Sequence, residues 1–272
     1  MNAATLPPWS FEGWVVVPLA ISLAWFAAGC ARLVPHASPT ALRKHAAIFL
    51  AGWAVLALDL TSPLHEAGER SFAAHMLEHE LLMLAAAPLL VLSRPVGIAL
   101  WAFPRPGRRA LAAFGHGIEG PWRVLTLPVV ATLLQAAALW FWHAPHWFDL
   151  ALAHRGWHVA QHVSFLVTAL LFWWAVLRNR GDNGLGVAVG CLFFTSIVGG
   201  ALGALMAFSG NAWYAGYAAS GLDAFGLPPA QDQQLAGLLM WIPGGLVHAG
   251  AGLALLARAL RARTGDHADA LD

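Results

Sequence analysis

Long apolar runs alternate with short polar segments along this chain. About 20 consecutive apolar residues suffice for a helix to cross the hydrocarbon core of a bilayer. We interpret seven runs as membrane-spanning helices, at residues 14–33, 42–60, 72–92, 124–142, 157–177, 187–208 and 235–256. The pattern therefore predicts an all-α membrane protein, a seven-helix transmembrane bundle that forms a single integral membrane domain over residues 1–272.

The longest polar segment, residues 93–123, separates the third run from the fourth. It contains Pro95, Pro104, Pro106 and Pro121 together with several arginines. Because proline interrupts a helix interior, we expect this segment to connect two spans at the membrane surface. A short amphipathic helix is expected near residues 108–116.

Basic residues predict the orientation of the bundle. If the N-terminus lies outside, 13 of the 15 Lys and Arg residues fall in inner segments, and only Arg70 and Arg155 fall in outer ones. Cytoplasmic segments of membrane proteins carry the excess of Lys and Arg. The N-terminus is therefore predicted outside, with residues 93–123 and the C-terminus in the cytoplasm.

Composition supports a membrane protein and argues against several other classes. The chain is 59% hydrophobic and 11% charged, whereas a soluble domain has about a quarter of its residues charged. The net charge of +1 gives no electrostatic reason to expect nucleic acid as a partner. The two cysteines, Cys30 and Cys191, form no C-x-x-C motif, so thiolate zinc sites and dithiol redox chemistry have no support.

Two histidine pairs at helical spacing form the main candidate site: His75 with His79, and His158 with His162. Residues four apart share one face of a helix, so each pair projects two imidazoles in one direction. Both pairs fall at the outer ends of predicted spans, where ionisable side chains are rare and usually functional. Since neutral imidazole is the commonest metal ligand, the pairs predict a metal or haem site between helices. The alternative is interfacial histidines that hydrogen-bond headgroups or loops.

His143 ends the fourth predicted span at the same depth, just before Pro145, and is a fifth candidate ligand. We expect three other outer histidines to be ordinary loop residues without a role in the site: His65, His146 and His154.

Acidic side chains near the same level have roles that the sequence leaves open. Asp59 and Asp149 could orient ligating histidines or cap helix ends. Glu78 and Glu80 point to different faces of one helix, so at most one of them can face the bundle centre.

Two methionines raise a similar question. Met83 lies four residues after His79, and Met240 enters the seventh span near the outer side. Thioethers together with imidazoles suit copper(I). A methionine on an apolar face, however, more often serves packing.

Several sequence blocks occur in a fixed order from the second predicted span to the seventh. They are Asp59–Leu64 (DLTSPL), His75–His79 (HMLEH), Trp142–Pro145 (WHAP), Phe148–Asp149, His158–His162 (HVAQH), Phe172–Trp174 (FWW), Asp232–Gln233 and Met240–Trp241. As a set they resemble the CtaG-like integral membrane family of cytochrome c oxidase assembly factors. Two positions depart from the pattern that the resemblance leads us to expect. Glu78 stands where we expect glutamine in many members, and Ala87–Pro88 stands where we expect two prolines before Leu89.

The resemblance implies a role in maturing haem–copper terminal oxidases, as a binding and assembly protein with no enzymatic turnover. It implies copper as the metal, supplied to or positioned in the oxidase core subunit at the outer face of a bacterial inner membrane. Expected partners are that core subunit, membrane lipids and a periplasmic copper chaperone. The histidines that match the family, and that become copper-ligand candidates, are His75, His79, His143, His158 and His162.

Three other functions also place histidines in membranes. Di-iron oxygenases and desaturases use H-x-x-x-H boxes, but this chain has no H-x-x-H-H box and its predicted site faces away from cytosolic reductants. A bis-histidine haem b electron carrier would need one ligand from each histidine pair. A metal or proton transporter is disfavoured because the sequence predicts no continuous polar path below His79, apart from His248.

Overall fold

The computed structural model describes residues 8–178, 184–222 and 225–269, and every regular element within them is helical. This confirms the all-α class. Six helical segments are long and apolar enough to cross a membrane. They are α1 (Gly13–Leu33), α2 (Pro39–Thr61), α4–η2–α5 (Phe72–Leu92), α11 (Arg155–Arg178), α12 (Gly184–Ala207) and α14 (Pro229–Asp269).

The fourth predicted span, residues 124–142, is not one straight helix. Residues Glu119–Leu125 form α8 and residues Pro128–His143 form α9, and the two are bent by 68°. Only together do they reach the length and hydropathy of a span. Pro128 fixes the start of α9, so the chain changes direction there. α8 still contacts the bundle, because the Trp122 ring centroid lies 5.7 Å from that of Trp174 on α11.

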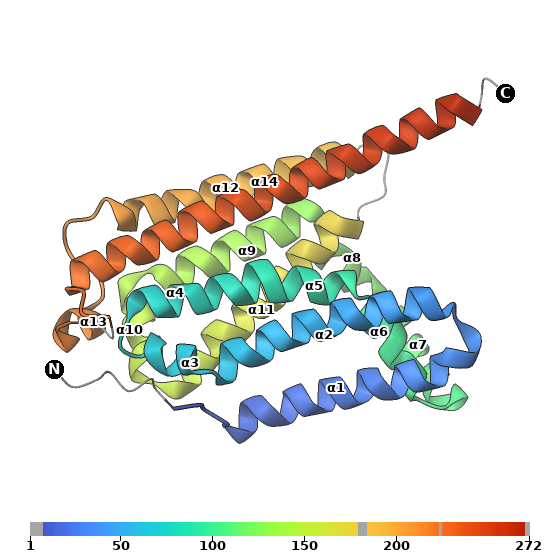
Figure 1. Cartoon of the computed structure of the whole chain (residues 1–272), viewed down its shortest axis with the longest axis horizontal. Coiled ribbons are helices and arrows are strands. Elements are labelled where there is room, and N and C mark those ends of the chain that lie inside the picture. The colour runs from blue at the N-terminus through green and yellow to red at the C-terminus, as the bar shows by residue number, and fades with distance from the viewer. Residues whose placement is uncertain (1–7, 179–183, 223–224, 270–272) are drawn as a thin grey trace.

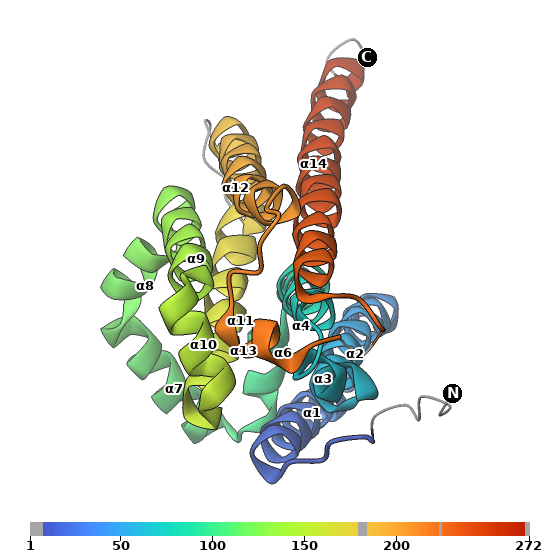
Figure 2. The same cartoon turned by 90° about the vertical axis from the view of Figure 1, so that its left-hand side faces the viewer.

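The spans run side by side along one long axis, as Figure 1 shows. Along that axis, in Figure 2, α12 and α14 pair at one side of the bundle and α1 lies at the opposite side. α14 packs along α12 and α4, while α11 packs along α9 and α5. The two helices that carry the histidine pairs, α4 and α11, therefore have neighbouring helices on several sides.

Short helices complete both ends of the bundle. The end that bears the histidine pairs carries α3 (Pro63–Gly68), α10 (Pro145–Ala153) and α13 (Ala215–Ser220). The other end carries η1 (Val34–His36), α6 (Pro95–Ala99), η3 (Leu100–Ala102) and α7 (Arg105–Gly117).

The predicted connecting segment, residues 93–123, is only partly a surface structure. α7 buries none of its residues, which agrees with the expected amphipathic surface helix. α6, in contrast, packs against α1, where a Cβ at Gly29 would overlap the Ile98 carbonyl group. Ser93 and Ile98 are both buried, so this part of the segment belongs to the bundle.

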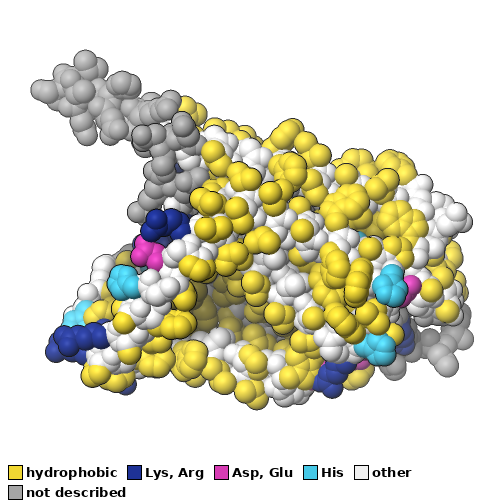
Figure 3. All heavy atoms as spheres, turned by 180° about the vertical axis from the view of Figure 1, so that it is seen from behind, with side chains coloured by type: hydrophobic (Ala, Val, Ile, Leu, Met, Phe, Trp, Pro, Cys, Tyr) yellow, Lys and Arg dark blue, Asp and Glu magenta, His cyan; other side chains and the backbone are white. Residues whose placement is uncertain are grey.

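The outer surface of the bundle is apolar over most of its length. The face in Figure 3 is covered by hydrophobic side chains, and its charged side chains gather toward the two ends. A band of this kind suits a bilayer, because hydrocarbon cannot solvate ionised groups. The exposed apolar residues include Leu133, Phe193, Ile197, Leu246 and Leu253.

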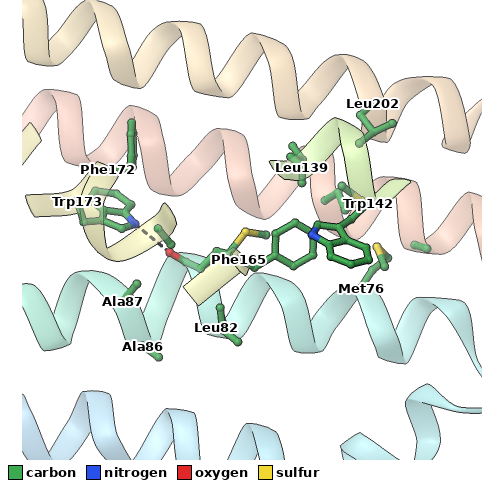
Figure 4. Close-up of a cluster of buried hydrophobic side chains, with 14 of the residues drawn as sticks. Met76, Leu82, Ala86, Ala87, Leu139, Trp142, Phe165, Phe172, Trp173 and Leu202 are labelled. Atoms are coloured by element: carbon green, nitrogen blue, oxygen red, sulfur yellow. Dashed lines mark hydrogen bonds between the residues drawn. The ribbon is translucent and has the colours of Figure 1, made fainter. Parts of the chain in front are cut away.

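The third span changes its helical geometry immediately after the first histidine pair. Residues Phe72–Glu80 form the α-helix α4, Leu81–Ala86 form the π-helix η2, and Ala87–Leu92 form the α-helix α5. Short π segments inside α-helices are frequent at functional sites. The indole of Trp173 donates a hydrogen bond to the Met83 carbonyl at 2.9 Å, drawn dashed in Figure 4, and so supports the wider turn.

Glycines allow α12 and α14 to approach closely. A Cβ built at Gly203 would lie 2.7 Å from the Gly237 carbonyl oxygen and 3.0 Å from the Trp241 nitrogen. The Cβ of a residue at Gly237 would in turn overlap the Gly203 carbonyl. Small residues at such a crossing let backbones touch, which is a common basis of helix packing in membranes.

We expect Gly203→Ala to lower the free energy of unfolding by roughly 1–3 kcal/mol, because the new methyl group must push two backbones apart. Gly190→Ala on the same helix is the matched control, since nothing lies within 4 Å of its Cβ position. The control should gain up to about 1 kcal/mol of helix propensity. Denaturant titration in detergent measures both, and equal stability of the two variants would contradict the packing account.

Candidate functional site

The first turn of α4 is held by a carboxylate from α14. Asp232 accepts hydrogen bonds from the backbone N–H groups of Phe72 at 2.6 Å and Ala73 at 3.0 Å, and from the Ser71 hydroxyl at 3.0 Å. All four residues are buried. A carboxylate at a helix N-terminus satisfies free N–H groups and complements the helix dipole. This contact fixes the helix turn that precedes the first histidine pair.

The two predicted histidine pairs face each other across the interface between α4 and α11. His75 and His158 lie with ring centroids 5.3 Å apart and planes 22° from parallel. His79 and His162 lie 4.9 Å apart. Within each helix the paired rings are 4.4 Å apart. The structure thus brings together all four imidazoles that helical spacing singled out.

His143 lies at the edge of this group. Its ring centroid is 6.2 Å from that of His79. Its Nδ1 lies 2.7 Å from the Leu139 carbonyl oxygen, and its Nε2 lies 3.2 Å from the Met76 sulfur. Both ring nitrogens of His143 therefore have partners among the described residues. Each of the other four candidate histidines, in contrast, has at least one ring nitrogen without a partner.

His65 belongs to the cluster, which differs from the expectation of a loop residue outside the site. It lies on the short helix α3, and its Nδ1 is 2.6 Å from the Glu78 carboxylate. Its ring stacks on His158 at 5.7 Å. The hydrogen bond to Glu78 raises the pKa of His65 above its ordinary value, although burial opposes this. His146 and His154 are exposed, as expected, although His146 lies in the short helix α10 and not in a loop.

Glu78 provides the negative charge of the cluster. Its carboxylate is fully buried, and the oxygen bound to His65 also lies 3.7 Å from His162 Nε2. A carboxylate beside imidazoles fixes their tautomer and favours their binding of a proton or a metal. Glu78, at the position where the resemblance led us to expect glutamine, therefore adds negative charge at the centre of the site.

Several donor atoms of the cluster have no hydrogen-bond partner in the part of the chain that the structure describes. Buried polar side-chain atoms normally have one. The described residues contain no group of three or more His, Cys, Asp or Glu side chains already arranged around a metal position. The cluster is a set of neighbouring donors whose rings would have to turn to converge. The unpartnered atoms are His75 Nε2, both ring nitrogens of His79, His158 Nε2, His162 Nε2 and Glu78 Oε2.

The two aspartates have different surroundings. Asp149 accepts hydrogen bonds from the backbone N–H groups of Ala215 and Gly216, both at 3.2 Å, and so caps α13. Asp59 is buried at the end of α2, and neither of its oxygens has a hydrogen-bond partner among the described residues. Asp59 interacts electrostatically with Glu78, which places it near the cluster.

Glu80 faces a separate cavity on the other side of α4. Glu80 is buried, as Glu78 is. Because Glu80 faces this cavity and Glu78 faces the histidines, the two carboxylates occupy different polar regions of the bundle interior. The cavity has a volume of about 40 Å³, enough for more than one water molecule. Polar groups therefore also occur in the bundle interior away from the histidine cluster, and His248 is among them. Lining residues include Glu80, Met83, Gln135, Thr195, Met240 and His248.

The two methionines line this cavity rather than the histidine cluster. The Met83 sulfur accepts a hydrogen bond from the Gln135 amide at 3.2 Å. Met76, which the sequence did not single out, is the methionine beside a cluster histidine. Its position directly after His75 gives no spacing signal, because neighbouring residues on a helix face different directions.

The profile of the cytochrome c oxidase caa3 assembly factor family matches residues 24–262. The chain belongs to this family. The match extends from α1 through most of α14 and includes every histidine of the cluster. Membership agrees with the resemblance found in the sequence. No solved structure gives a significant match.

Similar proteins occur in mycobacteria. Uncharacterised proteins of Mycobacterium bovis and Mycobacterium tuberculosis are each 26% identical over 256 residues, which is 88% of this chain and 37% of the relative. An uncharacterised Mycobacterium leprae protein is 28% identical over 142 residues, covering 47% of this chain and 20% of the relative. The chain thus spans at most 37% of the length of these relatives.

Asp232→Ala should destabilise the protein by roughly 2 kcal/mol, because charged acceptor bonds to the first turn of α4 are lost. Amide hydrogen exchange at Phe72 and Ala73 should accelerate selectively. Asp232→Asn keeps an acceptor oxygen and should fall between the parent and Asp232→Ala. Unchanged exchange at these two amides in Asp232→Ala would contradict the proposed anchoring.

Glu78→Gln should lower the pKa of His65 toward its ordinary value of about 6.5, because the charged acceptor becomes neutral. Glu66 makes a smaller electrostatic contribution to the same shift, so Glu66→Gln should lower the pKa less. NMR titration of the His65 ring in the metal-free protein measures both. An equal effect of the two variants would show that the hydrogen bond is not the main cause.

Proposed function

We propose that this protein is an assembly factor that binds copper at its histidine cluster and delivers it to, or positions it in, the core subunit of a haem–copper oxidase. Copper is the cargo of the protein and is not used for turnover. The observation that carries the proposal is the meeting of His75, His79, His158 and His162, which present five unpartnered ring nitrogens in one buried place.

The donor chemistry supports copper among the available metals. Imidazole binds copper well, and thioether adds affinity for copper(I). His143 and Met76 lie 3.2 Å apart beside the four central rings and supply one such imidazole–thioether pair. Cysteine thiolates take no part, since Cys30 and Cys191 lie outside the cluster. Ligands without thiolate should release copper(I) more readily than a thiolate cage, which suits transfer.

The location follows from the distribution of charge. In the proposed orientation the N-terminus and the histidine cluster lie at the periplasmic face of a bacterial inner membrane, with α7 and the C-terminus in the cytoplasm. The cluster then faces the compartment from which a copper chaperone would supply the metal. The receiving partner is proposed to be a membrane protein, the oxidase core subunit.

Aromatic packing argues against a bis-histidine haem site. Phe148 lies with its ring centroid 5.3 Å from that of His75, and Phe165 lies 4.7 Å from that of His79. These rings occupy space that a macrocycle held between α4 and α11 would need. Family membership also gives no support to an oxygenase or desaturase.

The test is copper binding by the purified protein in detergent. We expect the parent to retain copper after loading under reducing conditions and removal of loosely bound metal. A variant with His75, His79, His158 and His162 changed to alanine should retain almost none. A matched variant with the exposed histidines His116 and His146 changed to alanine should bind as the parent does.

Elemental analysis and an optical spectrum of each sample separate the outcomes. Thermal unfolding in detergent shows whether the fourfold variant is still folded. Absence of copper from the loaded parent, or equal copper in the fourfold variant, would contradict the proposal. A haem spectrum or stoichiometric iron in the protein as isolated would replace copper binding with another function.

A further inference from the structure

The histidine cluster reaches the protein surface through two openings of different character. A polar cleft of about 540 Å³ lies at the end of the bundle that carries α3, α10 and α13. An apolar groove of about 350 Å³ runs between α1, α2 and α11. His158 lines both openings, so each leads to the same group of imidazoles.

The polar cleft is acidic at its mouth and ends at imidazoles. Glu69 and Asp149 line it, and its lining includes no Lys or Arg. His75 lines it as well, although only 2% of the His75 surface is exposed, and its Nε2 has no hydrogen-bond partner among the described residues. Tyr217 closes one side, with its hydroxyl donating to the Gly68 carbonyl at 2.5 Å. The cleft thus combines surface carboxylates with a buried, unsatisfied nitrogen.

The apolar groove offers an ion a much poorer route. Its walls are mainly Val15, Leu19, Leu56 and Val163, all within membrane-spanning segments. Near the starts of α1 and α11, an ion pair joins Glu12 to Arg155 at 2.5 Å, and the Arg155 guanidinium lies over the Trp14 ring. An ion that crossed these apolar walls would have to lose its hydration without compensating contacts, which is strongly unfavourable.

We propose that the acidic cleft is the route by which a metal cation reaches the cluster from the aqueous phase. Glu69 attracts the hydrated ion at the mouth, and His75 and His158 replace its water as the first imidazole ligands. This inference rests on the proposed copper binding and adds its route and direction. The apolar groove, in contrast, carries no ion between water and the cluster.

Replacing Glu69 tests electrostatic attraction of the metal ion without disturbing the fold of the cleft. Asp149 has the same charge, but its two oxygens cap α13, so replacing it would disturb the fold of the cleft wall. Glu69 is exposed at the end of α3. Glu66 lies on the same helix and does not line the cleft, so Glu66→Gln is a control with the same change of charge.

The first experiment blocks each opening in turn. Cys30 and Cys191 are replaced by alanine, and single cysteines are introduced as Ala153→Cys in the cleft or Val163→Cys in the groove. Both sites are exposed, so each can be coupled to a bulky maleimide. The rate of copper(I) transfer from a coloured chelator is then followed by stopped flow.

We expect the label at Ala153→Cys to slow copper loading by about tenfold or more, because it obstructs the diffusional path of the ion. Ala153→Cys capped with the small reagent iodoacetamide, which removes the free thiol, and the maleimide-labelled Val163→Cys should both load at the parent rate. Loading at the parent rate with the cleft labelled would overturn the proposal. Slower loading only when the groove is labelled would assign the route to the groove.

The second experiment measures attraction at the mouth. Glu69→Gln should slow loading about two- to fivefold at low ionic strength, because local attraction of the cation is lost. The difference should vanish near 1 M salt, where the Debye length is about 3 Å. The copper content at saturation should stay that of the parent. Equal slowing by Glu66→Gln, or no salt dependence, would contradict the role of Glu69.

The two proposals fail in different ways. A parent protein that binds no copper removes the proposed function, and the route with it. A parent that binds copper at the cluster, but loads at the same rate whether or not the cleft is labelled, leaves the function standing and removes the route alone.

Discussion

The burial of imidazoles and carboxylates between apolar helices is the constraint on which the rest of this structure depends. An unsatisfied buried polar group costs roughly 1–3 kcal/mol, and water cannot relieve it inside a bilayer. Several buried or partly buried carboxylates meet this cost with local hydrogen bonds. Asp232 binds the start of α4, Glu78 binds His65, and Asp149 binds the start of α13. Other buried atoms also lack a partner among the described residues, such as both Asp59 oxygens and Glu80 Oε2, but the nitrogens of His75, His79, His158 and His162 lie together in one cluster, and we interpret this group as the binding site.

The third span lies between two polar regions, and side chains two residues apart on it face different ones. Glu78 lies with the histidines against α11, whereas Glu80 faces the cavity bounded by α9, α12 and α14. The π-helix η2 begins at the next residue, and its Met83 carbonyl is held by Trp173 of α11. Figure 4 shows this hydrogen bond among buried apolar side chains of the bundle core. Phe165, one of these buried side chains, also packs against His79, with ring centroids 4.7 Å apart.

Much of the fold could be predicted from the sequence, because spanning a bilayer requires long apolar runs that a sequence displays directly. The pairing of His75 with His79 and of His158 with His162 was also visible, because it needs only helical spacing. Their meeting across α4 and α11 was not, since it depends on how two helices rotate about their axes. The bend between α8 and α9 was missed because the apolar run continues through it, although Pro128 was the available signal.

His65 was missed for a related reason. It lies between the second and third predicted spans and was therefore expected in a loop. Pro63, however, occupies the first turn of α3, and the preceding Ser62 accepts a hydrogen bond from the Leu64 N–H at 3.3 Å. Serine followed by proline is a helix start as readily as a break. The polar cavity around Glu80 could not be foreseen, since Gln135, Thr195 and His248 come from three different helices.

The central claim, that the facing histidine pairs bind copper, is tested most directly by X-ray absorption spectroscopy of the copper(I)-loaded protein. The account predicts three or four nearest scatterers that are mainly nitrogen, with the multiple-scattering pattern of imidazole, and at most one sulfur from Met76. A coordination sphere dominated by sulfur, or one made of oxygen without imidazole scattering, would contradict binding by these four histidines.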